Sequence, residues 1–218
     1  MRRVSSLLLF ALLALIGLGG CSTTVYESIP VGTTTDCDPA WPGRWLPVAS
    51  PGDDAKPKDA LQISADCRTA TTKGEPKPMH LTLIGTKAGQ YLQIHNDSGE
   101  PDCIGTGKTH CGYVLLRYER EGDIVRLFDP DHAKVALAIG NGGIKGFSER
   151  GDSKGLKTSE PIHRNFIAGD ADRIGKVLRR HPELFAAEPL MVLRRVADLP
   201  ASAEVPAPAE AVQPTPEQ

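Results

Sequence analysis

Apolar and polar residues alternate with a period of two along much of the chain between Met79 and Ile139. This alternation is typical of half-buried β-strands, because successive side chains of a strand point to opposite faces. Short segments rich in Gly, Asp and Glu separate the alternating stretches, as turns between antiparallel strands do. The positions expected to point inward are Met79, Leu81, Leu83, Leu92, Ile94, Val114, Leu116, Val135, Leu137 and Ile139.

Further strands are predicted on both sides of this region. Residues 44–48 and 61–67 form the first two, residues 144–147 and 162–168 are weaker candidates, and residues 190–196 form the last. A meander of about eight or nine strands tends to close on itself, because closure removes its exposed edges. We therefore predict a mostly β protein that folds as an up-and-down antiparallel β-barrel.

One helix is expected shortly before the last strand. Asp170 is placed to cap its first turn, and Ile174, Val177 and Leu178 share one helical face. Pro182 cannot continue a helix, so we expect the helix to end before it.

The N-terminus contains Arg2 and Arg3, followed by an apolar run from Leu7 to Leu18. Its 12 residues are fewer than the about 20 that span a membrane core, and they fit the centre of a signal peptide. The tetrad Leu18-Gly19-Gly20-Cys21 resembles the lipobox of bacterial lipoproteins. The resemblance implies cleavage before Cys21 and acylation of this residue, which then anchors the chain in a membrane. Because Ser22 rather than Asp follows the cysteine, it also implies the outer membrane, facing the periplasm.

Composition divides the chain into four parts. Residues 1–20 are the expected signal peptide, and residues 21–36, rich in Ser and Thr, are the expected flexible tether. Residues 37–199 are the expected barrel-like domain. Residues 200–218 contain many Pro and Ala and no aromatic residue, so we expect a disordered tail.

The expected order of strands, one helix and a last strand resembles that of lipocalins. Gly43-Arg44-Trp45 also matches the Gly-x-Trp motif at the start of the first lipocalin strand. In that family the tryptophan closes one end of the barrel, and a later arginine packs across it. Arg164 is the nearest match in position, and Arg194 or Arg195 are alternatives. The resemblance implies a cavity for a small apolar ligand or lipid.

Four cysteines remain besides Cys21, and an even number in an exported domain predicts two disulfides. Antiparallel pairing of the first two strands brings Cys37 near Cys67, and Cys103 and Cys111 share one polar loop. We therefore predict Cys37–Cys67 and Cys103–Cys111. A soft-metal site is the alternative, formed by His95, Cys103, His110 and Cys111.

Charge and motifs restrict the function. Without residues 1–20 the chain has 23 Lys and Arg against 27 Asp and Glu, so we expect no nucleic-acid partner. The sequence contains no Gly-x-Ser-x-Gly, P-loop or His-Glu-x-x-His motif. We interpret "FDPDH" (residues 128–132) and "GNGGIKG" (residues 140–146) as turns between strands. We expect a protein that is not an enzyme and needs no metal or other cofactor.

Arg173, Lys176 and Arg180 form a stripe along the predicted helix, because they lie at positions i, i+3 and i+7. The stripe predicts contact with lipid phosphates, and a solvated helix face is the alternative. Two functions are compatible with these features. The first is a structural or interaction lipoprotein that binds another envelope component. The second is a lipocalin-like carrier of a small apolar ligand.

Overall fold

The computed structural model describes residues 22–34, 37–48, 60–72, 77–95, 101–105, 107, 109–151 and 161–196. The motif Leu18-Gly19-Gly20-Cys21, the expected signal peptide and the expected tail at residues 200–218 lie outside these residues. None of the described helices is long and apolar enough to cross a membrane.

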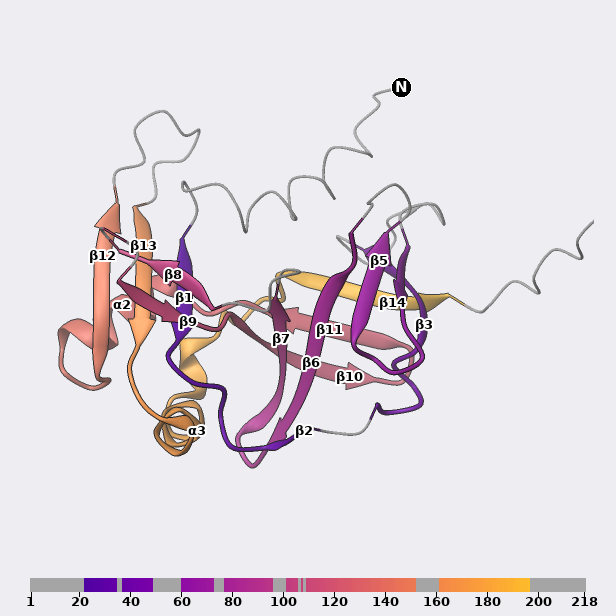
Figure 1. Cartoon of the computed structure of the whole chain (residues 1–218), viewed down its shortest axis with the longest axis horizontal. Coiled ribbons are helices and arrows are strands. Elements are labelled where there is room, and N and C mark those ends of the chain that lie inside the picture. Colours follow the sequence, from indigo (N-terminus) through magenta and orange to yellow (C-terminus); the bar gives the residue numbers. More distant parts are fainter. Residues whose placement is uncertain are drawn as a thin grey trace, which may run out of the picture.

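Within the described residues, eight strands form a closed antiparallel barrel, which confirms the predicted fold (Figure 1). Each strand pairs with the next barrel strand along the chain, and the last pairs with the first. In this order they are β3 (Gly43–Val48), β4 (Leu61–Ile63), β5 (Thr69–Thr72), β6 (Met79–Thr86), β7 (Gly89–His95), β10 (Leu115–Glu121), β11 (Ile124–Phe128) and β14 (Met191–Val196). A short strand, β2 (Thr33–Thr34), extends the sheet by pairing with β6.

The barrel interior is occupied by a contiguous cluster of buried side chains, and every barrel strand contributes to it. Trp41 packs against Trp45 at a centroid distance of 5.9 Å and meets Tyr118 edge-on at 5.1 Å. The cluster consists of Trp41, Trp45, Ile63, Cys67, Ala70, Leu81, Leu83, Leu92, Leu116, Tyr118, Val125, Leu127 and Leu193. Met79 and Ile94 pack against it, so the predicted inward positions on β6 and β7 are confirmed, as is Leu116 on β10.

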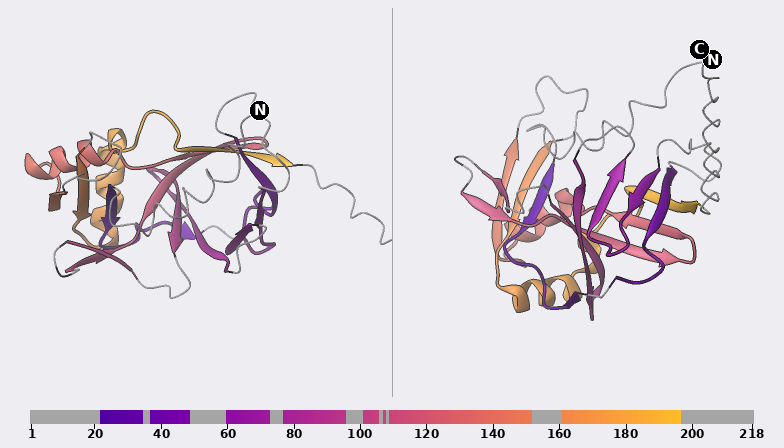
Figure 2. Two further views of the ribbon diagram at one scale, coloured as in Figure 1. Left: turned by 90° about the horizontal axis from the view of Figure 1, so that it is seen from above. Right: turned by 45° about the vertical axis from the view of Figure 1, so that its right-hand side comes forward.

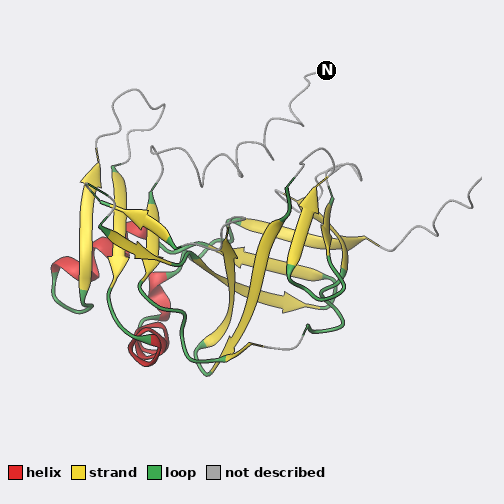
Figure 3. Ribbon diagram, viewed as in Figure 1, coloured by secondary structure: helices red, strands yellow, loops and turns green. Residues whose placement is uncertain are grey.

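A second unit, called here the inserted subdomain, lies between β11 and β14 in sequence (Figure 2). It contains α2 (His132–Gly140), β12 (Gly146–Gly151), β13 (Ile162–Ile167), α3 (Ala171–Arg180) and the 3-10 turn η2 (Pro182–Leu184). Strand β1 (Thr23–Tyr26) joins it, giving a three-stranded sheet in the order β1-β13-β12 in the described structure. The predicted helix before the last strand is α3, with Asp170 as its N-cap. Figure 3 shows that α2 lies beside this sheet and that α3 lies beyond the end of β13.

The subdomain packs on the outer face of the barrel. Ile84, Tyr91, Leu115 and Phe128 point outward from β6, β7, β10 and β11, and they are buried against the subdomain. Each directly precedes or follows an inward residue of the same strand, since neighbouring side chains alternate between the two faces. These strands are therefore apolar on both faces.

The prediction of a strand through Val135, Leu137 and Ile139 was wrong, because this segment forms the helix α2. Asp131 caps the helix by accepting a hydrogen bond from the Lys134 backbone N–H at 3.1 Å. Three alanines in the segment favour a helix more strongly than the β-branched residues favour a strand. Leu137 is 63% exposed, whereas Val135 is fully buried in the apolar cluster that the subdomain shares with the outer face of the barrel. "FDPDH" is thus the start of a helix rather than a turn between strands.

The expectation of a flexible tether from residue 21 to residue 36 was also wrong for its described part. Strand β1 runs parallel to β13, and Val25 and Tyr26 are fully buried. Thr24 and Val25 have the side chains of strand residues, and a parallel partner far along the chain supplies their hydrogen bonds. Val114 also differs from its predicted place, because it packs with Val25 beside β1 rather than inside the barrel.

Both expected disulfides are present. Cys37 and Cys67 join the segment before β3 to the turn after β4. Cys103 and Cys111 lie opposite each other in a hairpin of β8 (Asp102–Ile104) and β9 (His110–Gly112), which covers β1.

Candidate anion-binding site on helix α3

Helix α3 is amphipathic, with an apolar face and a cationic face. Ile174 and Leu178 are buried against the barrel-facing core of the subdomain. The Asp170 side chain caps the helix by accepting a hydrogen bond from the Arg173 backbone N–H at 2.9 Å. Because the apolar face is fixed inward, the residues of the predicted stripe are held on the exposed surface.

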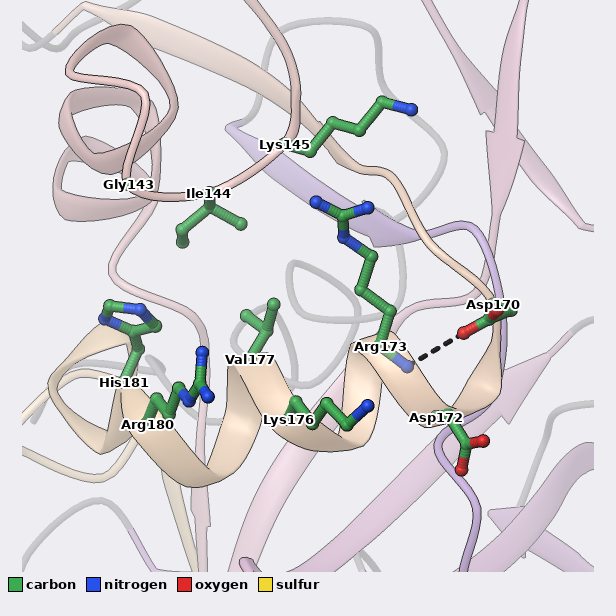
Figure 4. A pocket seen from close by; sticks show the side chains of 10 residues that line it. All are labelled: Gly143, Ile144, Lys145, Asp170, Asp172, Arg173, Lys176, Val177, Arg180 and His181. Atoms are coloured by element: carbon green, nitrogen blue, oxygen red, sulfur yellow. Dashed lines mark hydrogen bonds between the residues drawn. The ribbon is translucent and has the colours of Figure 1, made fainter.

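The stripe residues Arg173, Lys176 and Arg180 line one pocket of about 560 Å³. The opposite wall comes from the segment that joins α2 to β12, where Ile144 faces Val177 across the pocket (Figure 4). The complete lining is Gly143, Ile144, Lys145, Asp170, Asp172, Arg173, Lys176, Val177, Arg180 and His181. The structure thus brings all three predicted cations together and adds Lys145 as a fourth.

Sequence reasoning missed the contribution of residues 143–145. "GNGGIKG" does not join two strands, as expected, but follows α2 and ends it. Asn141 and Gly142 donate backbone hydrogen bonds to the last carbonyl groups of the helix, and Gly142 has a φ of +72°. An isolated Lys145 next to an apolar Ile144 gives no signal of a site until α3 is placed beside it.

Positive charge dominates the pocket. Among the described residues, Lys145, Arg173, Lys176 and Arg180 form no salt bridge. The lining contains four cationic side chains and two carboxylates, and Asp170 is already engaged as the helix cap. The N-terminal end of α3 adds the partial positive charge of the helix dipole.

Arg173 is positioned by the loop that precedes α3. Gly169 has a φ of +154°, and a β-carbon at this position would lie 2.8–2.9 Å from the side-chain carbons of Arg173. The Glu27 carboxylate accepts a hydrogen bond from the Gly169 N–H at 2.6 Å, which ties this loop to the end of β1. A side chain at position 169 would therefore displace Arg173 as well as strain the backbone.

His181 lies at the C-terminal end of the pocket. Its Nδ1 is 3.0 Å from the Glu183 carboxylate. A backbone hydrogen bond at Glu183 and the contact with His181 lower the pKa of this carboxyl group. Glu183 remains ionised near neutral pH and holds the imidazole at the rim of the pocket.

A second polar cluster involves the "FDPDH" segment. His132 Nε2 is 3.1 Å from the Asp129 carboxylate, and His132 Nδ1 is 2.9 Å from the Thr24 hydroxyl. Asn165 donates to the Thr24 hydroxyl at 3.2 Å and to the His132 carbonyl at 2.9 Å, and it accepts from Ser148 at 2.7 Å.

This cluster has the residue types of a hydroxyl–imidazole–carboxylate catalytic group, but its geometry is structural. Thr24 is only 2% exposed and Asn165 is fully buried, so the hydroxyl does not face a pocket. With the His132 Nε2–H donated to Asp129, the Thr24 hydroxyl donates to Nδ1 and accepts from Asn165. The cluster thereby satisfies the buried polar groups that join β1 to β13, β12 and α2.

The four residues of the alternative metal site do not come together as ligands. Cys103 and Cys111 are joined in a disulfide, and His95 stacks on His80 at 5.2 Å. His110 packs against the rings of Phe147 and Phe166. The described residues contain no group of three or more His, Cys, Asp or Glu side chains placed to hold a metal ion.

Gly43 begins β3, and Trp45, two residues further along this strand, belongs to the core cluster of the barrel. Gly43 has a φ of +124°, and the Trp45 indole N–H donates to the Trp41 carbonyl at 2.8 Å. Of the three arginines considered, Arg195 lies over the Trp45 ring at 5.9 Å and donates to the carbonyl groups of Ala40 and Pro42. Arg164, the nearest match in position, is instead in β13, opposite Thr23.

In comparisons with known proteins, the chain has no significant match to a family model, a curated protein or a solved structure.

Proposed function

We propose that the protein is a lipid-anchored, non-enzymatic interaction module of the bacterial outer membrane, facing the periplasm. Its barrel acts as a scaffold, and the α3 pocket binds an anionic group of a partner. The observation that supports this proposal best is the gathering of Lys145, Arg173, Lys176 and Arg180 around one pocket. The lipobox-like tetrad ending at Cys21 supports the anchor.

The chemistry of the pocket favours a phosphate or a related polyanion. Arg173 and Arg180 offer planar guanidinium groups suited to two-point hydrogen bonds with phosphate oxygens, and the lysines add mobile charges. A volume of about 560 Å³ accommodates a phosphate group together with part of the molecule that carries it. Because the cations are exposed, binding should weaken as the salt concentration rises.

A lipocalin-like carrier of a small apolar ligand is the second candidate. The up-and-down strand order and the contact of Arg195 with Trp45 favour it. The large side chains that occupy the barrel interior, Trp41, Trp45 and Tyr118 among them, weigh against it, because an apolar ligand would have to displace them.

Anion binding is tested on the full chain in a neutral detergent by calorimetric titration with pyrophosphate. The variant Arg173→Gln/Lys176→Gln should bind at least tenfold more weakly, since each charged hydrogen bond contributes about 1.5–3 kcal/mol. Arg179→Gln is the matched control, because Arg179 is an exposed residue of α3 that does not line the pocket. Equal binding by all three proteins would refute the site.

Anchoring is tested separately by expressing Cys21→Ser in a bacterium and fractionating the cells. We expect the wild-type chain in the membrane fraction, with acyl chains on Cys21 detected by intact-mass measurement. Cys21→Ser should lack the acyl mass, and it should appear among the soluble proteins instead of in the membrane fraction. An unmodified Cys21 in the mature wild-type chain would refute the anchor.

A further inference from the structure

The folded subdomain begins almost directly after the proposed anchor. Ser22 is the residue after Cys21, and its hydroxyl accepts a hydrogen bond from the His163 backbone N–H at 3.0 Å. Thr23 then starts β1 opposite Arg164. Neighbouring α-carbons are 3.8 Å apart, so acyl chains on Cys21 would hold this end of the sheet at the membrane surface.

The α3 pocket lies at the other end of the same sheet. β1 and β13 are parallel and both run toward α3, which begins four residues after Ile167 (Figures 1 and 2). β12 starts at this end, with Gly146 opposite Ile167, so Lys145 also belongs here. Glu27 and Val31, which follow β1, contact Gly169 and Ala171 at the start of α3.

The length of β13 separates the two ends. From Ile162 to Ile167 a strand extends about 16 Å, which is roughly twice the distance over which physiological salt screens a charge. When β13 is directed away from the anchoring membrane, the headgroups of that membrane therefore exert little attraction on Arg173, Lys176 and Arg180. With a long tether the pocket would reach that membrane, but the described part of the expected tether belongs to the fold.

We propose that the α3 pocket binds a phosphate-type anion presented from the side opposite to the anchoring membrane. This inference rests on the anchor and on the anion site of the proposed function. The same phosphate chemistry is available from a soluble phosphorylated compound or from the headgroups of a second membrane. It replaces the expectation that the α3 stripe contacts lipid phosphates of the membrane in which Cys21 is anchored.

The test uses the full lipidated chain in phosphatidylcholine vesicles. Mass spectrometry measures how fast an added acylating reagent labels the amino groups of Lys145 and Lys176. One sample has phosphatidylglycerol in the same vesicles, one receives soluble pyrophosphate, and one receives a second population of phosphatidylglycerol vesicles. Lys87, an exposed residue in the turn between β6 and β7, is the internal control. Arg173→Gln changes a residue of the pocket, and Arg179→Gln is the control because Arg179 does not line the pocket.

We expect pyrophosphate or the second vesicles to slow acylation of Lys145 and Lys176 at least threefold, with Lys87 unchanged and with the effect lost in Arg173→Gln. Protection by pyrophosphate alone identifies a soluble compound, and protection by added vesicles identifies a second membrane. Equal protection by phosphatidylglycerol in the anchoring vesicle would overturn the inference. Protection in none of the samples would overturn the anion site as well, and a chain that does not stay with its vesicles would overturn the anchor.

A linker insertion tests the geometry directly. About 15 Gly and Ser residues between Cys21 and Ser22 would add an average reach of roughly 20 Å. We expect phosphatidylglycerol in the anchoring vesicle to protect Lys145 and Lys176 in this variant, although it does not in the wild type. An unchanged pattern in the linker variant would contradict the claim that the short connection keeps the pocket away from its own membrane.

Discussion

The strands of the barrel and of the inserted subdomain differ in how far apart in the sequence their pairing partners lie. Most barrel strands pair with the next strand of the barrel across a short connection, whereas β14 pairs with β11 across the inserted subdomain and with β3 to close the ring. Together they bury an almost wholly apolar interior. The subdomain joins β1 to β13 across 141 residues of sequence, in parallel, and it buries Thr24 and Asn165 between them. The comparison shows that a barrel whose strands pair mainly in chain order carries a subdomain whose sheet depends on a pairing between distant segments.

The largest loss of stability is expected in the barrel. Trp45→Ala removes a fully buried side chain that packs against Trp41 and Arg195, and it should lower the free energy of unfolding by about 3–5 kcal/mol. Urea denaturation measures this, with Val31→Ala as the control because Val31 is 63% exposed. A loss below about 1 kcal/mol would mean that Trp45 does not support the core.

The two disulfides close loops of different length, one in the barrel and one in the β8–β9 hairpin that covers β1. Replacing Cys37 and Cys67 with Ala should cost roughly 3.5 kcal/mol in the barrel, because the bond closes a loop with a sequence separation of 30 residues. The same change at Cys103 and Cys111 should cost roughly 2.5 kcal/mol, because the separation is only 8 residues. Urea denaturation of the two double variants gives the order, and the reverse order would contradict the loop-entropy explanation.

A smaller effect is expected from the buried polar cluster of the subdomain. Thr24→Val keeps the shape of the side chain, but it leaves His132 Nδ1 without a partner and removes one of the two hydrogen bonds that the Asn165 amide donates, at a cost of about 1–3 kcal/mol. Thr71→Val on the exposed side of β5 is the matched control. If both variants unfold at the same urea concentration, the cluster does not hold β1 in place.

The smallest effect at neutral pH is expected for Tyr26→Phe, which should change the free energy of unfolding by less than about 1 kcal/mol. The Tyr26 hydroxyl is buried and has no hydrogen-bond partner among the described residues, so its removal leaves no group unsatisfied. Equilibrium unfolding at pH 7 measures the change, and a loss above 2 kcal/mol would reveal a partner for this hydroxyl.

Alkaline pH should make Tyr26→Phe more stable relative to the wild type. Burial, aided by the charges of Tyr91 and Asp129, raises the pKa of Tyr26, and burial raises the pKa of Tyr91 to about 12 although Arg117 lowers it. Both phenols release their protons more readily in the unfolded chain, so the stability they confer is complete below about pH 10 and is lost as the pH rises toward 12. Tyr26→Phe should therefore lose less stability than the wild type between pH 10 and 12, and equal losses would contradict this assignment.

The barrel could be predicted from the sequence because the features that specify it, alternation within strands and short turns between them, are local. Alternation places Leu81, Leu83 and Leu116 correctly, and the short turns determine which strands are neighbours. The subdomain was missed for a physical reason, because the partner of β1 lies far along the chain and no periodicity indicates it. One signal was present: paired apolar residues such as Leu83-Ile84 and Leu127-Phe128 predict strands that are covered on both faces.

The candidate site was predicted in part for the same reason. The helical spacing of Arg173, Lys176 and Arg180 is a local pattern, and the three residues do line one pocket. Lys145 comes from another segment, and the direction in which the pocket faces depends on the parallel pairing of β1 with β13. Both are tertiary properties that composition and spacing do not contain.

The most direct test of the central claim, an anchored barrel without cargo, is native mass spectrometry. The protein is extracted in mild detergent from its own membranes, and its mass is compared with that of the denatured chain. We predict the chain from Cys21 onward with its acyl groups, lighter by four hydrogens for two disulfides, and no apolar molecule released on denaturation. An apolar molecule that accompanies the native protein and leaves on denaturation would contradict the account and identify a carrier.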